Sequence, residues 1–346
     1  MISGEVGAIE AGIYKISHSP YELKFLPKYF SFQEKRNGTL LRIQDSEGHY
    51  GYADLHQWPL NFESEQSRLS LQTAETDLYF RKKKQSVWNE FSNASIENLN
   101  IGIKNNYLLV NFASESDSGF VEIKNELAQA IELGFKVVKV KAGKNLDFEL
   151  SRLQKLIGDF PSLQWRLDFN SALTYKDARS FFSKLNAAEI SKIEYVEDPT
   201  SYNSSEWMEL NKIIPLAFDQ PTGVNGSVVS LATDSFRHLV LKPALQNTDS
   251  LVEWALENNK KLTVTSFMDH PLGQANAFYK ALQIKSKLGI KAGELLNVCG
   301  LRTQFLFTKT EFSNEIENSK PQLLFPKGIG FGFDQQLRNL KWLQLN

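Results

Sequence analysis

The chain has 346 residues, and its 39 Lys and Arg nearly balance its 40 Asp and Glu, for a formal net charge of −1. A chain of this length can form one large domain and a smaller one, and a charge near zero without a long basic run excludes electrostatic steering toward nucleic acid or an anionic membrane. We therefore expect a small-molecule partner, with no nucleic acid and no membrane, and the choice between monomer and homo-oligomer stays open.

The expected compartment follows from cysteine use and from the N-terminus. Cys299 is the only cysteine, so no disulfide framework can form within the chain. The opening MISGEVGAIEAG has neither the basic start nor the apolar stretch of a signal peptide. No apolar run approaches the roughly 18 residues of a membrane helix. These features predict a soluble, cytoplasmic protein.

The first part of the chain has the pattern of short antiparallel strands followed by a helix. Strands are expected at Tyr29–Gln33, Thr39–Ile43 and His49–Ala53, with KRNG and DSEG as the turns between them. The apolar spacing becomes helical from Glu63 to Lys84. This predicts a small α+β unit over residues 1–105.

From about Leu108, short apolar runs alternate with amphipathic segments. Strand then helix, repeated about every 25 residues, is typical of a parallel sheet with crossover helices. Roughly seven or eight such units in one stretch would favour a closed barrel, and no glycine-rich phosphate loop supports a dinucleotide-binding sheet. The expected strands are Val137–Val140, Trp165–Phe169, Ile193–Val196, Leu216–Phe218, Leu239–Leu241 and Leu262–Val264, and the expected helices are Gly119–Leu133, Asn145–Ile157, Tyr175–Leu185, Ser204–Ile213 and Thr248–Glu257.

Charged side chains recur where the predicted strands end. In FKVVKVKAG, Lys139 and Lys141 are two residues apart, so a strand directs both to one face. Proline follows three of the other strand ends and cannot continue a central ladder, which marks where each loop begins. In a barrel this end of the strands carries the active site. The other charged or polar residues at strand ends are Arg166, Asp168, Asn170, Glu197, Asp219 and Lys242.

Each of these residues alone has an ordinary explanation as a turn residue, a helix cap or a solvated charge. Unpaired burial of such charges on successive strands would be costly, which favours a site where they neutralise one another. Three converging carboxylates need a cation, and oxygen ligands from separate strands suit Mg²⁺, with Mn²⁺ as a substitute.

The same charges suggest a class of reaction. Removing a proton next to a carboxylate creates a dianionic enediolate, which requires concentrated positive charge and a base. A lysine serves as the base once its pKa is lowered from about 10 toward the working pH. A second lysine and a metal ion nearby lower the pKa in this way, as at Lys139 and Lys141.

These motifs resemble those of the enolase superfamily, and within it most closely the o-succinylbenzoate synthase family of menaquinone biosynthesis. The resemblance spans nearly the whole chain. GYADL at Gly51–Leu55 is similar to a segment of the superfamily's capping domain, and SFMDHPLG from Ser266 is similar to its strand-seven loop. The site motifs are K-V-K at Lys139–Lys141, R-x-D-x-N at Arg166–Asn170, V-E-D-P at Val196–Pro199, Asp219, and L-K-P at Leu241–Pro243.

The resemblance implies an α/β fold, a modified TIM-type (β/α)7β barrel with an N-terminal α+β capping domain. The cap would span residues 1–105 and the barrel residues 106–305, with the active site at the carboxyl-terminal ends of its strands. Residues 306–346 would pack back on the cap. Loops near His18–Tyr21 and His56–Pro59 would close over the substrate.

The resemblance also implies a role for each site residue. The reaction would be the loss of water from 2-succinyl-6-hydroxy-2,4-cyclohexadiene-1-carboxylate to give 2-succinylbenzoate, so the enzyme would be a carbon–oxygen lyase. Lys141 would be the general base, assisted by Lys139, and Lys242 would stabilise the anionic intermediate from the opposite face. Asp168, Glu197 and Asp219 would bind Mg²⁺, and Arg166, Asn170 and Ser266 would contact the substrate.

Departures from the family pattern leave alternatives open. Gln220 follows Asp219 where many relatives have Glu, and Asp54 occupies a cap position where Glu is common. A racemase of N-acyl amino acids or a dipeptide epimerase would use two opposed lysines as bases, although KAGELLNVCG lacks the Asp-x-Asp of many epimerases. A cycloisomerase would use the same site. A catalytically silent ligand-binding barrel is the alternative from another class, and the retained carboxylates and lysines argue against it.

Overall fold

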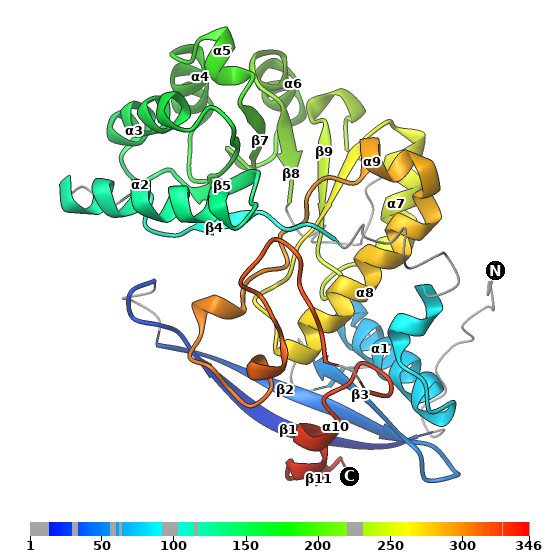
Figure 1. The fold of residues 1–346 in the computed structure, drawn as a ribbon. Helices are drawn as coiled ribbons and strands as arrows, with labels where there is room; N and C mark the ends of the chain where they lie inside the picture. The colour runs from blue at the N-terminus through cyan, green and yellow to red at the C-terminus, as the bar shows by residue number, and fades with distance from the viewer. Residues whose placement is uncertain are drawn as a thin grey trace.

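The structure is a computed structural model that describes residues 14–29, 34–55, 60–61, 64–91, 103–113, 117–219, 231–326 and 328–345. Two sheets organise these residues (Figure 1). One is antiparallel and four-stranded, in the order β11-β1-β2-β3, and the other is parallel and seven-stranded, in the order β10-β9-β8-β7-β6-β5-β4. Helix α8 (Pro271–Leu288) extends from the parallel sheet toward the antiparallel one.

The antiparallel sheet forms the cap together with helix α1 (Glu65–Lys82) and the 3-10 turn η1 (Val87–Phe91). Alternate side chains of the central strands meet α1 in a separate apolar core, made by Leu41, Ile43, Ala53, Leu55, Leu71, Ala74 and Leu78. Helix α1 approaches so closely that a Cβ at Gly51 would overlap with backbone and side-chain atoms of the helix. The strands are β1 (Lys15–Lys24), β2 (Lys35–Gln44), β3 (Tyr50–Leu55) and β11 (Leu343–Gln344).

Two predictions for this cap were wrong. KRNG is not a turn but the start of β2, and His18–Tyr21 is not a loop but part of β1. The period-2 signal of β1 is hidden in the sequence because its inward positions include the small polar residues Ser17 and Ser19. Of the strand expected at Tyr29–Gln33, only Tyr29 is described, in a turn, and the loop at His56–Pro59 lies outside the described residues.

The parallel sheet confirms the six strands expected after Leu108, and helices cover its outer face. Several of these helices begin after an Asn or Thr whose side chain accepts a backbone N–H of the first turn, as at Asn145, Thr174 and Asn203. The strands are β4 (Tyr107–Leu109), β5 (Val137–Lys141), β6 (Gln164–Asp168), β7 (Ile193–Glu197), β8 (Leu216–Phe218), β9 (His238–Leu241) and β10 (Lys261–Val264). The helices are α2 (Asp117–Glu132), α3 (Leu146–Asp159), α4 (Tyr175–Ser183), α5 (Ala187–Ile190), α6 (Ser204–Ile213), α7 (Thr248–Glu257), α8 and α9 (Ala292–Leu295), with 3-10 turns at Thr233–Ser235 and Gly289–Lys291.

Residues 296–300 close this sheet into a barrel. On one side the backbone N–H of Asn297 donates to the carbonyl of Leu262 at 2.8 Å, and the backbone N–H of Gly300 donates to the carbonyl of Val264 at 2.8 Å. On the other side the amide of Cys299 donates to the carbonyl of Lys104 at 2.7 Å. The segment therefore occupies the place of an eighth strand between β10 and the residues just before β4, as the (β/α)7β prediction requires.

Side chains of the barrel strands alternate between two environments. One set, including Val140, Leu167 and Val196, packs against the helices in the main core. The opposite set points into the barrel, where Tyr195, Ala217 and Val240 form a small apolar cluster. The charged strand-end residues belong to this inward set, so sequence parity directs them into the barrel.

The last part of the chain returns to the cap. It contains 3-10 turns at Gln304–Leu306 and Ser313–Glu315, helix α10 (Asp334–Asn339) and strand β11, which pairs antiparallel with β1. These features confirm the predicted fold class, a modified TIM-type barrel with an N-terminal α+β cap. The domain boundaries near residues 105 and 305 stay predictions. Among the described helices, none has the length and apolar character needed to cross a bilayer.

Candidate active site

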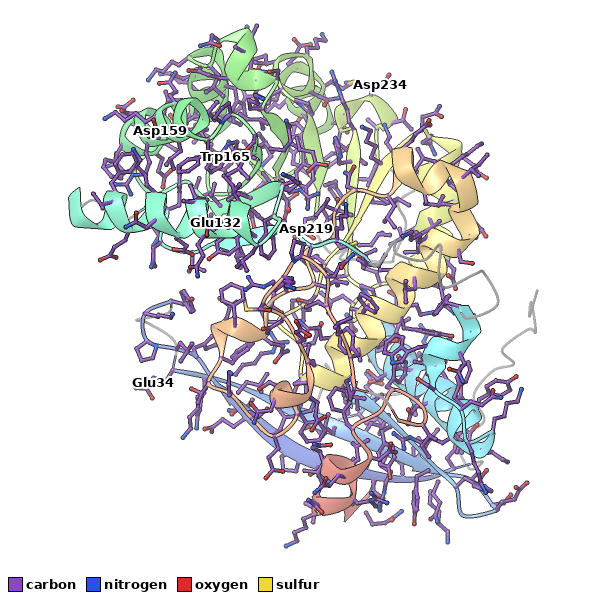
Figure 2. All side chains as sticks on the ribbon, viewed as in Figure 1. Glu34, Glu132, Asp159, Trp165, Asp219 and Asp234 are labelled. Atoms are coloured by element: carbon purple, nitrogen blue, oxygen red, sulfur yellow. The ribbon has the colours of Figure 1, made fainter. Side chains whose placement is uncertain are left out.

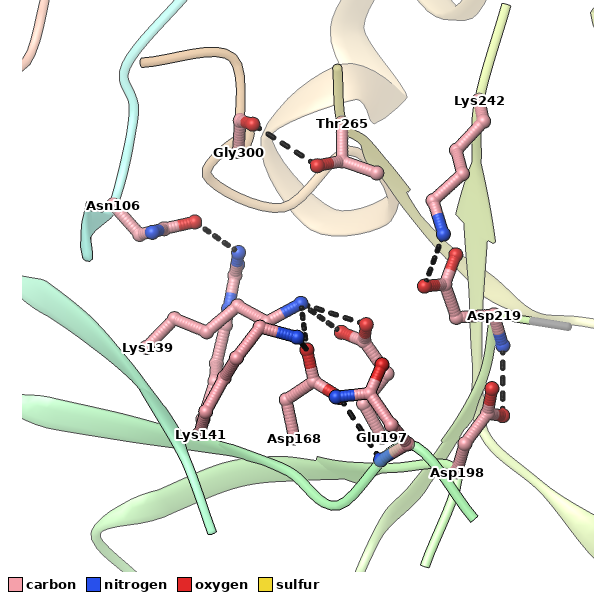
Figure 3. Close-up of polar contacts among 12 residues, drawn as sticks. Asn106, Lys139, Lys141, Asp168, Glu197, Asp198, Asp219, Lys242, Thr265 and Gly300 are labelled. Carbon is pink, nitrogen blue, oxygen red and sulfur yellow. Dashed lines mark hydrogen bonds and ion pairs between the residues drawn. The ribbon is translucent and has the colours of Figure 1, made fainter. Parts of the chain in front are cut away.

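Six charged side chains meet at the carboxyl-terminal ends of the barrel strands (Figure 3). Lys139 and Lys141 lie on β5, Asp168 ends β6 and Glu197 ends β7. The two other residues, Asp219 and Lys242, follow directly after β8 and β9. Figure 2 shows Asp219 at the end of the barrel that faces the cap, whereas Asp234 lies at the far end.

Lysines and carboxylates alternate in this group. The Nζ of Lys139 donates to both carboxylate oxygens of Glu197, at 2.6 and 2.8 Å, and lies 3.0 Å from Oδ2 of Asp168. The Nζ of Lys141 lies 3.4 Å from the same Asp168 oxygen. On the opposite side, Lys242 donates to Oδ2 of Asp219 at 2.5 Å. Every carboxylate of the group thus has a lysine partner.

Burial and ion pairing compete in setting the pKa values. Burial would raise the pKa of Asp168, but Lys139 and Lys141 outweigh it and hold that pKa below its usual value. Burial would lower the pKa of Lys139, but Asp168 and Glu197 raise it well above the usual value. Burial raises the pKa of Glu197 to about 8, and it also raises that of Asp219 against the opposing effect of Lys242. Lys139 is therefore held as a cation.

The three carboxylates have the donor chemistry of a Mg²⁺ site, since each offers hard oxygen ligands from a different strand. Oδ1 of Asp219 is buried and has no hydrogen-bond donor among the described residues, so it is available to a cation. The other oxygens are drawn to lysines, and a cation would replace part of those contacts. A second group of acidic and histidine side chains lies in the β2–β3 turn. Among the residues described, the potential ligand atoms of Asp45, Glu47 and His49 all lie within 4.8 Å of one another. Within that group Glu47 and His49 are exposed, and Asp45 and Glu47 are paired with Lys82, so we assign it no site.

Backbone strain marks the loops that follow the strands. Asn170, Ser171 and Asp198 have positive φ values of 47°, 60° and 41°, which are unfavourable for residues other than glycine.

Asp198 was not singled out from the sequence, although it is the Asp of V-E-D-P. Its Oδ1 accepts the backbone N–H of Asp219 at 3.0 Å and so helps to position that carboxylate. Burial raises the pKa of Asp198 to about 7.

The three expected substrate contacts differ in environment. Arg166 is fully buried, with Nε donating to Glu194 at 2.7 Å and Nη2 donating to the carbonyl of Val298 at 2.7 Å. These bonds explain its burial without a ligand. Ser266 is buried and shares a hydrogen bond of 2.8 Å with Thr303. The third residue, Asn170, is exposed beside Asp168, whose Oδ1 accepts its backbone N–H at 3.2 Å.

Two further polar residues near the site were not predicted. Asn106 accepts from Nη1 of Arg166 at 3.2 Å, and the hydroxyl of Thr265 donates to the carbonyl of Gly300 at 2.9 Å (Figure 3). Asn106 precedes a strand of only three residues, and the partner of Thr265, Gly300, belongs to the closing segment without regular strand structure. No motif in the sequence marks Asn106 or Thr265 as a site residue.

A cavity of about 470 Å³ lies at the other end of the barrel, where the strands begin. Its lining includes Gln164, Glu194, Arg237 and Lys261, and none of the six strand-end charges. We therefore locate the candidate active site from the converging charges. In parallel-sheet barrels catalytic residues occupy the carboxyl-terminal ends of the strands.

Comparisons with known proteins agree with this geometry. A family model described as "Enolase C-terminal domain-like" matches residues 122–224. An o-succinylbenzoate synthase of Bdellovibrio bacteriovorus is 33% identical over 96% of this chain and 98% of its own length. An L-Ala-D/L-Glu epimerase of Francisella tularensis subsp. novicida is 25% identical over 44% of this chain and 41% of its own.

Solved structures share the fold at low sequence identity. The muconate lactonizing enzyme from Pseudomonas putida superposes with a TM-score of 0.69 at 15% identity, covering 95% of this chain and 99% of that one. A mandelate racemase/muconate lactonizing protein from Herpetosiphon aurantiacus gives a TM-score of 0.69 at 13% identity, covering 92% and 97%. These likenesses extend over both the cap and the barrel.

Proposed function

The chain belongs to the enolase superfamily, and we propose that it is a Mg²⁺-dependent o-succinylbenzoate synthase. The proposed reaction removes water from 2-succinyl-6-hydroxy-2,4-cyclohexadiene-1-carboxylate to give 2-succinylbenzoate, a carbon–oxygen lyase reaction. A place in menaquinone biosynthesis and a cytoplasmic location are part of this proposal. The observation that carries it is the set of lysines on both sides of three carboxylates in a chain related end to end to a synthase.

In the proposed mechanism Lys141 is the base. It is the most exposed of the three lysines, with 46% of its side chain accessible, and its single ion-pair contact is the longest of the group at 3.4 Å. It would take the proton next to the substrate carboxylate and then, as an ammonium on the same face, protonate the departing hydroxyl. Lys139 has 15% of its side chain exposed and is held by two carboxylates, which suits a permanent positive charge beside the base.

Lys242 has a different role on the opposite side of the site. Its ammonium contacts Asp219 and would stabilise the negative charge of the enediolate without transferring a proton. Asp168, Glu197 and Asp219 would hold Mg²⁺, which when bound supplies positive charge to the substrate carboxylate. Asp198 would keep Asp219 in place through the bond from its backbone N–H.

Racemisation or epimerisation is the second candidate, because lysines on two sides of one site would also serve as two opposed bases. The partial match to an L-Ala-D/L-Glu epimerase favours keeping this candidate. In that reaction Lys242 would exchange a proton, which distinguishes it from dehydration. The same fold and metal ligands would serve both reactions.

The test is a direct assay of the purified protein. Mixed with the cyclohexadiene substrate and Mg²⁺, it should change the ultraviolet absorbance as the aromatic product forms. Excess EDTA should abolish turnover, and Mg²⁺ or Mn²⁺ should restore it. Asp219→Asn should lose most activity, since removing one charged ligand weakens binding of a hard cation. Full activity in excess EDTA would reject the metal site, and no turnover with Mg²⁺ would reject the synthase.

A further inference from the structure

The cap presents one cation to the mouth of the barrel that the proposed mechanism does not use. Arg36 lies on β2, where it pairs in register with Leu23 of β1. Its guanidinium lies over the ring of Phe267, with Cζ 4.7 Å from the ring centroid. Phe267 follows β10 by three residues, so Arg36 reaches the same end of the barrel as Lys141 and Lys242.

The face of β2 that carries Arg36 is directed toward the barrel. Gly38 is the next residue on that face, and a Cβ there would overlap with the ring of Tyr21, which therefore lies flat on the strand. The Tyr21 hydroxyl donates to Asp54 at 2.8 Å, and its ring packs against His270 at 4.7 Å between centroids. Asp54 also accepts the backbone N–H of His270 at 2.9 Å. These contacts fix the cap against the loop that follows β10, the SFMDHPLG segment.

The end of the β1–β2 hairpin is fixed as well, by the segment that follows barrel closure. Phe25 packs on Phe307 with ring centroids 4.7 Å apart. The backbone N–H of Leu26 donates to the carbonyl of Leu306 at 2.9 Å, and that of Thr308 donates to Lys24 at 2.8 Å. Arg36 thus pairs with a part of β1 that is held by contacts on either side of Leu23, which limits the movement of Arg36 and preorganises it for a ligand.

The guanidinium group of Arg36 has no hydrogen-bond or ion-pair partner within the described parts of the chain. It is half-buried, and its contact with Phe267 covers a face of the guanidinium, which leaves the in-plane N–H donors to a ligand. A planar fork of donors matches a carboxylate in a bidentate geometry. Its neighbour Lys35 points to the other face and is already paired with Glu22 at 2.7 Å.

We propose that Arg36 binds the second carboxylate of the substrate, the one at the end of the succinyl chain. This rests on the proposed function, in which the ring carboxylate occupies the site among Lys139, Lys141 and the three carboxylates. The distal carboxylate then extends toward the cap, where Arg36 selects dicarboxylates over substrates with an uncharged side group.

The experiment compares two ligands that differ in one carboxylate. Binding of 2-succinylbenzoate and of 2-butyrylbenzoate to the Mg²⁺-loaded protein is measured by calorimetry for the wild type, Arg36→Gln and Lys35→Gln. We expect Arg36→Gln to weaken binding of 2-succinylbenzoate by about 10–100-fold, as a charge-assisted bond to a carboxylate would, and to leave 2-butyrylbenzoate unchanged. Lys35→Gln should match the wild type with both ligands.

Kinetics provide an independent readout. Arg36→Gln should raise KM for the cyclohexadiene substrate with kcat nearly unchanged, because the bond is made equally in the ground and transition states. Arg36→Lys, which keeps the charge but loses the fork, should be intermediate and replaces Arg36→Gln should the latter not fold. Equal loss of affinity for both ligands, or no loss for either, would overturn the assignment.

The outcomes separate this inference from the proposed function. If the wild type dehydrates the substrate but Arg36→Gln keeps its KM, the inference fails and the function stands. If the wild type does not dehydrate the substrate, the function fails, and the ligand pair still decides about Arg36. A wild type that binds both ligands equally would reject a carboxylate site at Arg36.

Discussion

At the scale of the residue, the two lysines of K-V-K have different surroundings although they share a strand and a face. Lys139 is held by Asp168 and Glu197 at 2.6 to 3.0 Å, whereas Lys141 is half-exposed and has one contact at 3.4 Å. A residue that must accept and return a proton needs access to the substrate and freedom from strong partners. This difference supports the proposal that Lys141 is the base and Lys139 the fixed charge beside it.

The proposed roles predict distinct outcomes for substitutions of Lys141 and Lys242, which lie on the two sides of the site. Lys141→Ala should lose about 10²–10⁴-fold in kcat, the usual contribution of general acid–base catalysis. Lys242→Arg keeps the positive charge but cannot act as a base near neutral pH, so it should retain measurable turnover in the same absorbance assay. An inactive Lys242→Arg, with Lys141→Ala still exchanging the α-proton of one enantiomer of an N-succinyl amino acid in D₂O, would favour racemisation instead.

At the scale of the element, one arginine joins the C-terminal tail to the cap. Arg81, near the end of α1, lies 2.5 Å from Asp77 on its own helix and 2.5 Å from Asp334 of α10. Asp77 is completely buried and also accepts the backbone N–H of Phe331 at 2.7 Å. Loss of Arg81 would leave this buried carboxylate without its cation and remove the ion pair that links α1 to Asp334 of the tail.

We accordingly expect Arg81→Met to lower the free energy of unfolding by about 3–5 kcal/mol, as breaking a buried ion pair does. Lys82→Met is the matched control, since the neighbouring Lys82 pairs with Asp45 on the surface and its loss should change stability little. Urea unfolding followed by circular dichroism measures both variants. Equal stability of the two variants would contradict the role given to Arg81.

At the scale of the whole molecule, the fold buries His238 and His270 in surroundings that favour the neutral form of the imidazole ring. Burial, with nearby cations such as Lys261 and Arg166, lowers the pKa of His238 to about 3. Burial lowers the pKa of His270 to about 4. An unfolded histidine has a pKa of about 6.5. The unfolded chain therefore binds more protons below that pH, and these two groups make the free energy of unfolding fall as pH drops from about 6.5 toward 4.

His238 offers a test of this dependence, because its ring contacts Asn297 at 2.8 Å inside the barrel rather than a charged partner. Between pH 7 and pH 5 it should account for about 2 kcal/mol of lost stability. His238→Gln should thus be less stable than the wild type at pH 7 but lose about 2 kcal/mol less on acidification. Urea unfolding at several pH values measures this, and the same pH dependence in both proteins would refute it.

Local patterns in the sequence determined much of this protein. The alternation of apolar runs with amphipathic segments determined the strands and helices of the parallel sheet, because the period of burial is a property of each segment alone. Parity within each strand determined that Lys139, Lys141, Asp168, Glu197, Asp219 and Lys242 face one interior, and proline marked the end of three strands.

Other features were decided by contacts between residues far apart in the chain. β1 has serines at inward positions and acquires strand structure by pairing with β2 and β11, so its sequence shows no period. The closing segment at residues 296–300 depends on bonds to β10 and to Lys104, and no local signal marks it. The pairing of Arg166 with Glu194 and the position of Arg36 over Phe267 likewise arise only when separate elements pack together. Sequence patterns report the environment that a segment requires, whereas partners distant in the chain are chosen by tertiary packing.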